Sequence, residues 1–272
     1  SIDDLLDEGI TPPEMGIPFG WKSLDNITYG MAKGGVYTIG AGTGSGKTQF
    51  IRDILANAVL NHKQKAVMLS YEDSGQNILL KMAGYNGEKV LHRPDASTDL
   101  DSWTKEVTEL VEPFKNKLFV INRKDLPTCD NLFRRLRNYI ASTGATIVAI
   151  DNLSNLTNGS SNERTDIDKI CNGLQKMALE LGIIVLLAVH LTNPTDKGKG
   201  KTFEEGRKVV SANLRGSAAI ASSSFMVLSV ERNKASEDEV ERNSVIIRVL
   251  KDRRLGEADG HVTRLTYSHG TG

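Results

Sequence analysis

The sequence has little of several features that would restrict where the protein works. Its 272 residues include two cysteines, Cys129 and Cys171, which lack metal-ligand spacing, so we expect ordinary buried or half-buried thiols in a reducing compartment. No apolar run approaches the roughly 20 residues that span a bilayer, and no secretory signal opens the chain. Neither sign of charge is in excess, since 34 Lys and Arg balance 34 Asp and Glu. The sequence thus indicates a protein that is neither secreted nor in a membrane, and any surface that binds nucleic acid must be local.

From Val36 onward, apolar strand patterns alternate with helical patterns. The run Val36 to Ile39 leads into a glycine cluster, and a helical stretch follows from about Thr48 to Leu60. Further buried strands are predicted at residues 66–71, 118–121, 146–150 and 183–189, and further helices at 103–114, 132–140 and 167–181. Continuous apolar strands separated by helices predict an α/β fold with a mostly parallel sheet covered on both faces.

The two ends of the chain differ from this pattern. Residues 1–30 are predicted to be an N-terminal arm or linker before one domain at residues 31–272. In the last third, three strand patterns at residues 225–230, 245–250 and 262–267 are joined by short polar loops. We therefore expect antiparallel strands at one edge of the sheet near the C-terminus.

The strongest motif is the small-residue loop between the first strand and the first long helix. It runs Ala41, Gly42, Thr43, Gly44, Ser45, Gly46, Lys47 and Thr48, and fits the P-loop except that alanine holds the first glycine position. Small residues let backbone N–H groups surround phosphates, and the helix N-terminus adds its positive dipole end. Lys47 would then reach the β- and γ-phosphates, and the Thr48 hydroxyl would bind Mg²⁺. The loop predicts ATP, or another nucleoside triphosphate, with Mg²⁺ as cofactor.

Three polar residues directly follow predicted strands, where ligands bind in open α/β sheets. Asp151 would hold the Mg²⁺ shell, although a helix cap or turn residue would have the same pattern. Glu72 would orient and deprotonate the attacking water, with Asp73 as a competitor and a surface carboxylate as the alternative. His190 would contact the γ-phosphate and report its loss, or be a structural histidine.

Two segments after His190 are candidates for binding DNA. The stretch 192–208 is polar and basic, as a loop that follows a phosphate backbone would be, and a solvated loop is the alternative. The segment 213–217 offers a cation beside a glycine that allows close backbone approach. The candidate DNA-binding residues are Lys197, Lys199, Lys201, Arg207, Arg215 and Gly216. We expect contacts mainly to the DNA backbone, and residues 152–164 are a third candidate loop.

Taken together, the motifs resemble the DnaB-like hexameric replicative helicases, above all the short phage and mitochondrial-type primase-helicases. The resemblance covers about Gly16 to Tyr267. It extends beyond the P-loop to the motifs at residues 70–73, 150–153, 189–194, 204–207, 214–217, 231–233 and 250–253. Members of this family often lack the first P-loop glycine. The resemblance implies a RecA-like fold and an ATP-driven ring, a homo-hexamer, that moves on single-stranded DNA with 5′ to 3′ polarity and unwinds duplexes.

The resemblance also assigns roles to single residues. It implies that Glu72 is the catalytic glutamate and His190 the phosphate sensor. Arg253 resembles the arginine finger that reaches a neighbouring subunit's site, and the adjacent Arg254 is the alternative. Tyr267 is similar to an aromatic residue that packs on the nucleotide base. Primase and polymerase are implied as partners, and the bacterial or phage-infected cytoplasm or the mitochondrial matrix as the location.

Two other functions remain open at the level of sequence. A RecA-type recombinase filament would share the core fold, but the histidine after the fifth predicted strand and the late motif at residues 251–253 favour the helicase. A nucleotide-gated regulatory ATPase without strand transport would show no stimulation of hydrolysis by DNA.

Overall fold

The computed structural model describes residues 2, 15–93, 99–121, 123–158, 160–192 and 201–268. Residues 1 and 3–14 of the predicted arm lie outside the described residues. The described chain forms one eight-stranded sheet in the order β3-β2-β4-β5-β1-β6-β7-β8. The strands are β1 Val36–Ala41, β2 Ala66–Ser70, β3 Leu118–Val120, β4 Ile147–Asp151, β5 Ile184–His190, β6 Met226–Arg232, β7 Ser244–Asp252 and β8 Val262–Thr266.

The direction of the strands confirms a mostly parallel sheet with antiparallel edge strands. Strands β1 to β6 pair in parallel wherever they are neighbours. Only β7 and β8 are antiparallel to their neighbours in the sheet. The expectation that all three late strands are antiparallel additions was therefore wrong for β6, which runs parallel to β1. Helix α9 lies in the connection before β6, as the crossover to a parallel strand requires.

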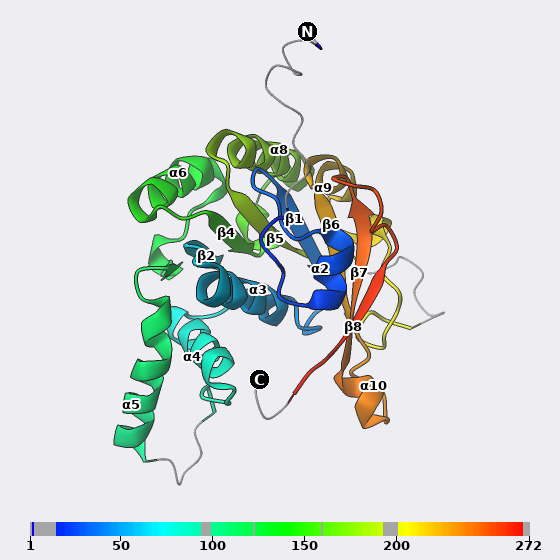
Figure 1. Ribbon diagram of the computed structural model, residues 1–272. Helices are drawn as coiled ribbons and strands as arrows, with labels where there is room; N and C mark the ends of the chain where they lie inside the picture. The colour runs from blue at the N-terminus through cyan, green and yellow to red at the C-terminus, as the bar shows by residue number, and fades with distance from the viewer. Residues whose placement is uncertain are drawn as a thin grey trace.

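Helices cover both faces of this sheet (Figure 1). One face packs against α2, α3 and α4, and the other against α6, α7, α8 and α9. The helices are α2 Lys22–Thr28, α3 Lys47–His62, α4 Gly75–Gly87, α5 Leu100–Val111, α6 Leu132–Thr143, α7 Leu153–Thr157, α8 Glu163–Leu181, α9 Ser217–Ser223 and α10 Glu239–Asn243. Helices α6 and α8 end at Gly144 and Gly182, whose φ angles of 68° and 61° are left-handed.

The segment from Met15 to Met31 packs into the core. Ile17 pairs with Met31 in an antiparallel bridge, and Phe19 is fully buried. The ring of Trp21 stacks on Phe50 of α3, with the centroids 4.9 Å apart. The Asp25 carboxylate accepts the backbone N–H of Phe19 at 2.6 Å, and burial raises the pKa of this carboxyl. The segment thereby forms part of the wall beside the first long helix.

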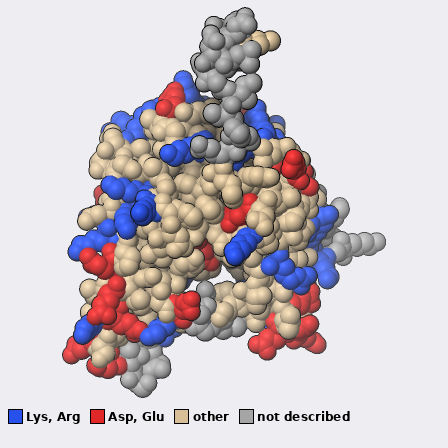
Figure 2. Space-filling model, viewed as in Figure 1, with Lys and Arg blue, Asp and Glu red and all other residues tan. Residues whose placement is uncertain are grey.

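The burial of the cysteines and the mixture of surface charges agree with the sequence. Cys171 is buried and Cys129 is half-buried, and burial raises the pKa of the Cys171 thiol to about 12. No helix of the described residues is long and apolar enough to cross a membrane. Figure 2 shows lysine and arginine side chains interspersed with carboxylates over one face, as expected of a chain with a balanced charge.

Replacing Phe19 with alanine tests whether residues 15–31 belong to the core. Removing this fully buried ring should lower the free energy of unfolding by about 3–5 kcal/mol, measured by urea denaturation. The control Met15→Ala removes a side chain that is 58% exposed and should change stability by less than about 0.5 kcal/mol. Equal stability of the two variants would show that the segment is not part of the cooperative core.

Candidate nucleotide-binding site

The glycine-rich loop turns at the carboxyl end of β1 and leads into α3. Gly44 and Gly46 have φ angles of 67° and 101°, in the left-handed region that favours glycine. Ser45 N–H donates to the Gly42 carbonyl at 3.2 Å, and α3 begins at Lys47. The loop therefore curves at a helix N-terminus, which is the arrangement that binds phosphate. Ala41 is fully buried as the last residue of β1, where its methyl group fits into the core.

Lys47, Thr48 and Asp151 meet at the bottom of this loop. The Thr48 hydroxyl donates to Asp151 Oδ2 at 2.6 Å, and Lys47 Nζ lies 3.7 Å from Asp151 Oδ1. Both charged side chains are almost completely buried, and burial raises the pKa of the Asp151 carboxyl and lowers that of the Lys47 ammonium. Neither Lys47 Nζ nor Asp151 Oδ1 has a hydrogen-bond partner within the described chain. Buried polar atoms in this condition fit ligands that supply the missing bonds.

The donors at this point suit a phosphate and a divalent cation. An ammonium and backbone N–H groups bind phosphate oxygens, whereas a hydroxyl and a carboxylate are the hard oxygen ligands that Mg²⁺ prefers. Lys47 would contact the phosphates, and Thr48 and Asp151 would hold the cation. These assignments agree with the sequence predictions in position, and the magnesium itself stays a prediction.

Glu72, Asn152 and His190 form a second polar group at the same edge of the sheet. The Glu72 carboxylate accepts a hydrogen bond from Asn152 Nδ2, and His190 Nε2 lies 3.3 Å from Glu72 Oε1. His190 Nε2 also lies 2.9 Å from Asn152 Nδ2. The Glu72 side chain remains 47% exposed. A carboxylate that is hydrogen-bonded yet open to solvent is suited to holding a water molecule.

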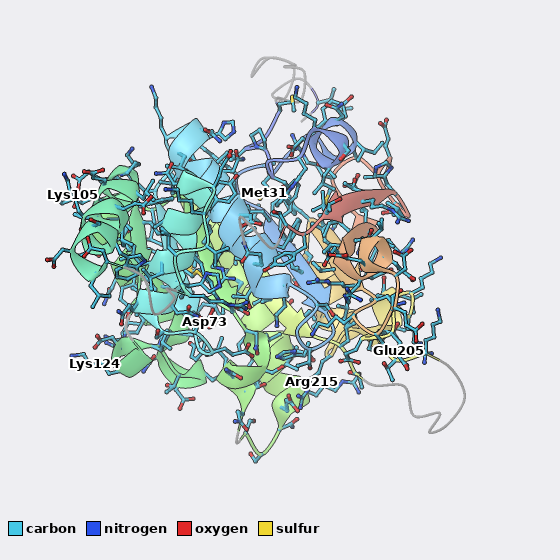
Figure 3. The ribbon with its side chains drawn as sticks, turned by 90° about the horizontal axis from the view of Figure 1, so that it is seen from below. Met31, Asp73, Lys105, Lys124, Glu205 and Arg215 are labelled. Atoms are coloured by element: carbon cyan, nitrogen blue, oxygen red, sulfur yellow. The ribbon has the colours of Figure 1, made fainter. Side chains whose placement is uncertain are left out.

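Asp73, the competitor of Glu72, is bonded to other residues (Asp73 is labelled in Figure 3). Its Oδ2 accepts from Arg52 Nη1 at 2.9 Å and lies 3.5 Å from Lys81 Nζ. Its Oδ1 accepts from Asn77 Nδ2 at 2.9 Å. Because Asp73 is held by two cations, Glu72 is the carboxylate of this pair that meets Asn152 and His190. The geometry favours Glu72 as the base, a role that stays a hypothesis.

A cavity of about 630 Å³ opens beside the P-loop. Gly46 lines it together with Trp21 and Phe50, and Tyr267 lines it from the end of β8. Arg232 lies over the Tyr267 ring, with its guanidinium carbon 4.8 Å from the ring centroid. The volume is within the range of pockets that enclose small ligands. The predicted aromatic contact to a base thus has its tyrosine in the wall of a cavity that reaches the phosphate loop.

The two candidate arginine-finger residues lie at the opposite end of the strands from the P-loop, near the amino end of β1. Asp252, the last residue of β7, pairs with Met226, and Met226 pairs with Tyr37 near the start of β1. At about 3.3 Å per residue, Tyr37 lies roughly 13 Å along the strand from Ala41. Arg253 follows at this far edge, where it is exposed and donates to the Ser222 carbonyl at 2.5 Å.

The neighbours of Arg253 make similar contacts. Arg254 donates to the Tyr29 carbonyl at 3.2 Å, and Lys251 to that of Ala221. Because the P-loop lies beyond the carboxyl end of β1, both arginines are remote from the P-loop of their own chain. Of the two, Arg253 is the more exposed.

The predicted DNA-binding residues are only partly covered by the structure. Lys197 and Lys199 lie outside the described residues, and Lys201 is exposed. Arg207 lies over the ring of Phe203, 6.0 Å from its centroid. Phe203, the aromatic residue of the basic stretch, is buried against Gly42, so it is not available to stack on a base.

Arg215 is bound to the strand end that carries His190. Its backbone N–H donates to the His190 carbonyl at 3.2 Å, and the preceding Leu214 pairs with Leu191. Its guanidinium forms an ion pair with Glu163 at the start of α8 (Arg215 is labelled in Figure 3). Gly216 caps α9 with a φ of 80°, and a Cβ there would come within 2.5 Å of Ile167. Packing of α9 on α8 therefore requires this glycine whether or not DNA is bound.

Three polar residues of the site were not predicted. Asn152 could have been found, because it directly follows Asp151 at a strand end. Arg232 had a weaker signal as part of the motif at residues 231–233. Lys234 had none, although its Nζ lies so close to Gly44 that a Cβ on this glycine would be 2.2 Å away.

A mostly parallel sheet with a P-loop after β1 and an acid as the last residue of β4 defines a P-loop NTPase of the RecA-like fold. The family model of the DnaB-like helicase C terminal domain matches residues 16–269, and the chain belongs to that family. This confirms the predicted family and fold class.

Curated relatives and solved structures agree with this assignment. The chain is 27% identical to a DNA helicase/primase of Enterobacteria phage T3, over 100% of the chain and 48% of the relative. It is 24% identical to the replicative DNA helicase DnaB of Haemophilus influenzae, over 89% of the chain and 51% of the relative. The chain thus spans about half the length of these relatives.

Among solved structures, the ATPase domain of G40P is similar with a TM-score of 0.79 and 19% identity, over 100% of this chain and 96% of that one. The structure of a DnaB-like replicative helicase, described with its interactions with primase, is similar with a TM-score of 0.78 and 19% identity. This match covers 99% of this chain and 65% of that one. At these identities the likeness supports the fold alone.

Replacing Glu72 with glutamine tests the assignment of the base. The amide keeps the size of the side chain but cannot take a proton, so ATP turnover should fall about 10²- to 10⁴-fold while nucleotide still binds. Steady-state phosphate release and equilibrium binding of a fluorescent nucleotide measure the two effects. Glu109→Gln, on the exposed side of α5, is the matched control. Turnover that survives in Glu72→Gln would exclude this carboxylate as the base.

Proposed function

We propose that the chain is the motor domain of a replicative DNA helicase that hydrolyses ATP, moves on single-stranded DNA and unwinds duplex DNA. Membership of the DnaB-like family and relatives named as DNA helicases support the class of activity. The proposal rests mainly on one observation, which is that the phosphate-binding groups and the candidate arginine finger lie at opposite ends of the strands. The phosphate loop lies at one edge and Arg253 at the other.

In the proposed site, the chain supplies its own phosphate-binding groups. Lys47 and the loop N–H groups bind the β- and γ-phosphates, and Thr48 and Asp151 hold Mg²⁺, which neutralises charge on the phosphate oxygens. Glu72 orients the attacking water and takes its proton. Tyr267 lies against the base.

A neighbouring copy completes the site. An arginine finger stabilises the charge that spreads over the transferred phosphoryl group. Arg253 is remote from its own P-loop, so in this proposal it serves the site of the next subunit. Such a head-to-tail contact closes into a ring when the rotation between copies allows, and six copies are the number expected from the resemblance.

Hydrolysis would be coupled to DNA through the carboxyl end of β5. His190 contacts the carboxylate that would hold the attacking water, and its carbonyl is bonded to the Arg215 N–H. Loss of the γ-phosphate would move the His190 side chain and with it the segment that carries Arg215. In the proposal, the single-stranded DNA is bound by Lys197, Lys199, Lys201, Arg207, Arg215 and Gly216.

Partners and location follow from the same proposal. A relative is named as a helicase/primase, and a similar structure is described with its interactions with primase, so a primase is proposed as a partner along with a polymerase. The protein would work in the bacterial or phage-infected cytoplasm, and the mitochondrial matrix is the other reducing compartment that the sequence allowed. The match to a helicase family disfavours the recombinase and regulatory alternatives.

The proposal is tested by strand displacement from a forked duplex, with ATP and with a non-hydrolysable analogue. The chain should separate the strands only with ATP, and Lys47→Ala should abolish both displacement and ATP turnover. Mixing Lys47→Ala with a double Arg253→Ala, Arg254→Ala variant tests the shared site. Neither variant should hydrolyse ATP alone, whereas in a random equal mixture about one quarter of the contacts combine an intact loop with an intact finger. A mixture as inactive as its components would exclude a finger supplied by a neighbour.

Replacing Glu163 with glutamine tests the DNA-binding role of Arg215. The change releases Arg215 from its ion pair, so affinity for oligo-dT should rise about twofold to fivefold, measured by fluorescence anisotropy. Arg215→Ala should weaken binding and reduce the salt dependence by about one phosphate contact.

Glu180→Gln is the matched control for the Glu163 change, because it breaks a similar pair with Arg137 at the other end of α8. If Glu163→Gln and Glu180→Gln change the affinity equally, Arg215 is not part of the DNA surface.

A further inference from the structure

Arg52, on the first long helix, is a buried cation that the proposed reaction does not use. Its side chain is almost completely enclosed, and its two terminal nitrogens bond in different directions. Nη1 donates to Asp73 Oδ2 at 2.9 Å, and Nη2 donates to Gln49 Oε1 at 2.6 Å. Its Nε has no hydrogen-bond partner within the described chain. A buried cation arranged in this way is costly, so it is weak evidence for stability and points to a specific conformational role.

Gln49 continues the chain of hydrogen bonds toward the cavity. Its Nε2 donates to Asp53 Oδ1 at 2.6 Å. Gln49 and Asp53, four residues apart, lie on one face of α3, and both line the cavity of about 630 Å³ together with Gly46 and Tyr267. The Asp53 carboxyl therefore forms part of the wall of the space next to the phosphate loop.

Asp73, at the other end of this series of hydrogen bonds, fixes the segment that carries Glu72. The Asp73 carboxylate is held by Arg52 and Asn77, and its backbone N–H donates to the Ser70 hydroxyl at 3.2 Å. Glu72 is the preceding residue. Four side chains thus connect the wall of the cavity to the peptide beside the proposed base.

The surroundings of Asp53 allow its carboxyl to change protonation and hydrogen bonding near neutral pH. Burial raises the pKa of the Asp53 carboxyl to about 7, whereas the neighbouring Arg52 lowers it. The cavity also presents Tyr85 and Glu88 from α4 and its end, and Arg232 from β6. A carboxyl that titrates near neutral pH changes its hydrogen bonding readily when a ligand enters.

We propose that Asp53, Gln49, Arg52 and Asp73 form a positioning relay through which a nucleoside in the cavity sets the position of Glu72. This rests on the proposed function, because it requires that the cavity takes the nucleoside part of the bound triphosphate. A hydrogen-bond donor of the base or ribose contacts the Asp53 carboxyl, Gln49 and Arg52 transmit the change, and Asp73 holds Glu72 in place. None of the four residues touches the reacting phosphate, so they are positioning residues.

The relay predicts that the protein distinguishes ATP from a bare triphosphate in kcat as well as in KM. Inorganic tripolyphosphate occupies the phosphate loop and leaves the cavity empty. The chain, with Mg²⁺ and oligo-dT, should turn over ATP with a kcat about 10-fold above that for tripolyphosphate, because only ATP orients the base through the relay. Gln49→Leu interrupts the relay at similar volume and should reduce the ratio of the two kcat values toward one.

Two further variants separate the relay from general effects on folding. Arg52→Lys keeps the charge but not the two-way bonding, so it should lower the ratio as Gln49→Leu does. Gln64→Leu, just beyond the C-terminal end of α3, is the matched control, because its bonds to His62 and Thr146 lie outside the relay. Thermal melts confirm that each variant is folded under the assay conditions.

The pH dependence provides a readout that a purely structural role would not change. Since the pKa of Asp53 is about 7, the carboxylate predominates above this pH and accepts the stronger hydrogen bonds. The kcat for ATP should therefore rise through neutral pH more than the kcat for tripolyphosphate, and Asp53→Asn should remove this difference. The tripolyphosphate series corrects for ionisation of the phosphate chain itself.

The outcomes distinguish the relay from the function on which it rests. A ratio that falls in Gln49→Leu and Arg52→Lys but not in Gln64→Leu, with loss of the pH difference in Asp53→Asn, supports the relay. If the wild-type chain hydrolyses ATP but Gln49→Leu slows ATP and tripolyphosphate equally, the relay is overturned and the proposed function is not. A wild-type chain that cleaves neither substrate overturns the proposed function, and the relay with it.

Discussion

The parallel register of four strands is the constraint on which the site depends. Ser70 is level with Asp151, and Ala41 with His190, so the carboxyl ends of β2, β4, β1 and β5 meet at one edge of the sheet. A polar residue at the end of any of these strands, or just beyond it, is brought to the same place, however far apart the residues are in the sequence. This convergence buries Lys47 beside Asp151 and leaves Lys47 Nζ and Asp151 Oδ1 without hydrogen-bond partners in the described chain, which destabilises the fold. A ligand that fills those bonds stabilises the folded state by mass action.

The reversal of direction at β7 distributes the remaining groups. Because β7 is antiparallel to β6, its last residues lie at the edge opposite the P-loop, and β8 then returns to the P-loop edge with Tyr267. One hairpin thus brings an aromatic ring to the chain's own cavity and carries Arg253 away from it. With a parallel β7, the arginine would have been at the near edge. The dependence of the proposed hydrolysis on a neighbour is therefore built into the direction of a single strand.

The sequence was sufficient for features that depend on local pattern. Periodicity located the strands, and strand-end positions brought together Glu72, Asp151 and His190, whose meeting in space follows from the parallel register. It was insufficient where partners come from the tertiary packing. The direction of β6 depends on its pairing with β1, which no local pattern encodes. Arg52 looked like any helix-surface charge until packing enclosed it. Asp73 and Glu72 are adjacent acids that differ only in which neighbours the fold brings to them.

The contact between His190 and Arg215 limits how the proposed site could move the candidate DNA-binding segment. Strand β5 is a central strand with six of its seven residues buried, so it cannot shift without breaking the ladders on both sides. The His190 side chain is then the part that can move, because two backbone hydrogen bonds and the burial of Leu214 in the core hold the following segment to the strand end. In the proposed mechanism, a rotation of the His190 side chain on loss of the phosphate would act on the segment at this attachment point. In the proposed mechanism the sheet stays rigid, and the free energy of hydrolysis would act on side chains and loops at its end.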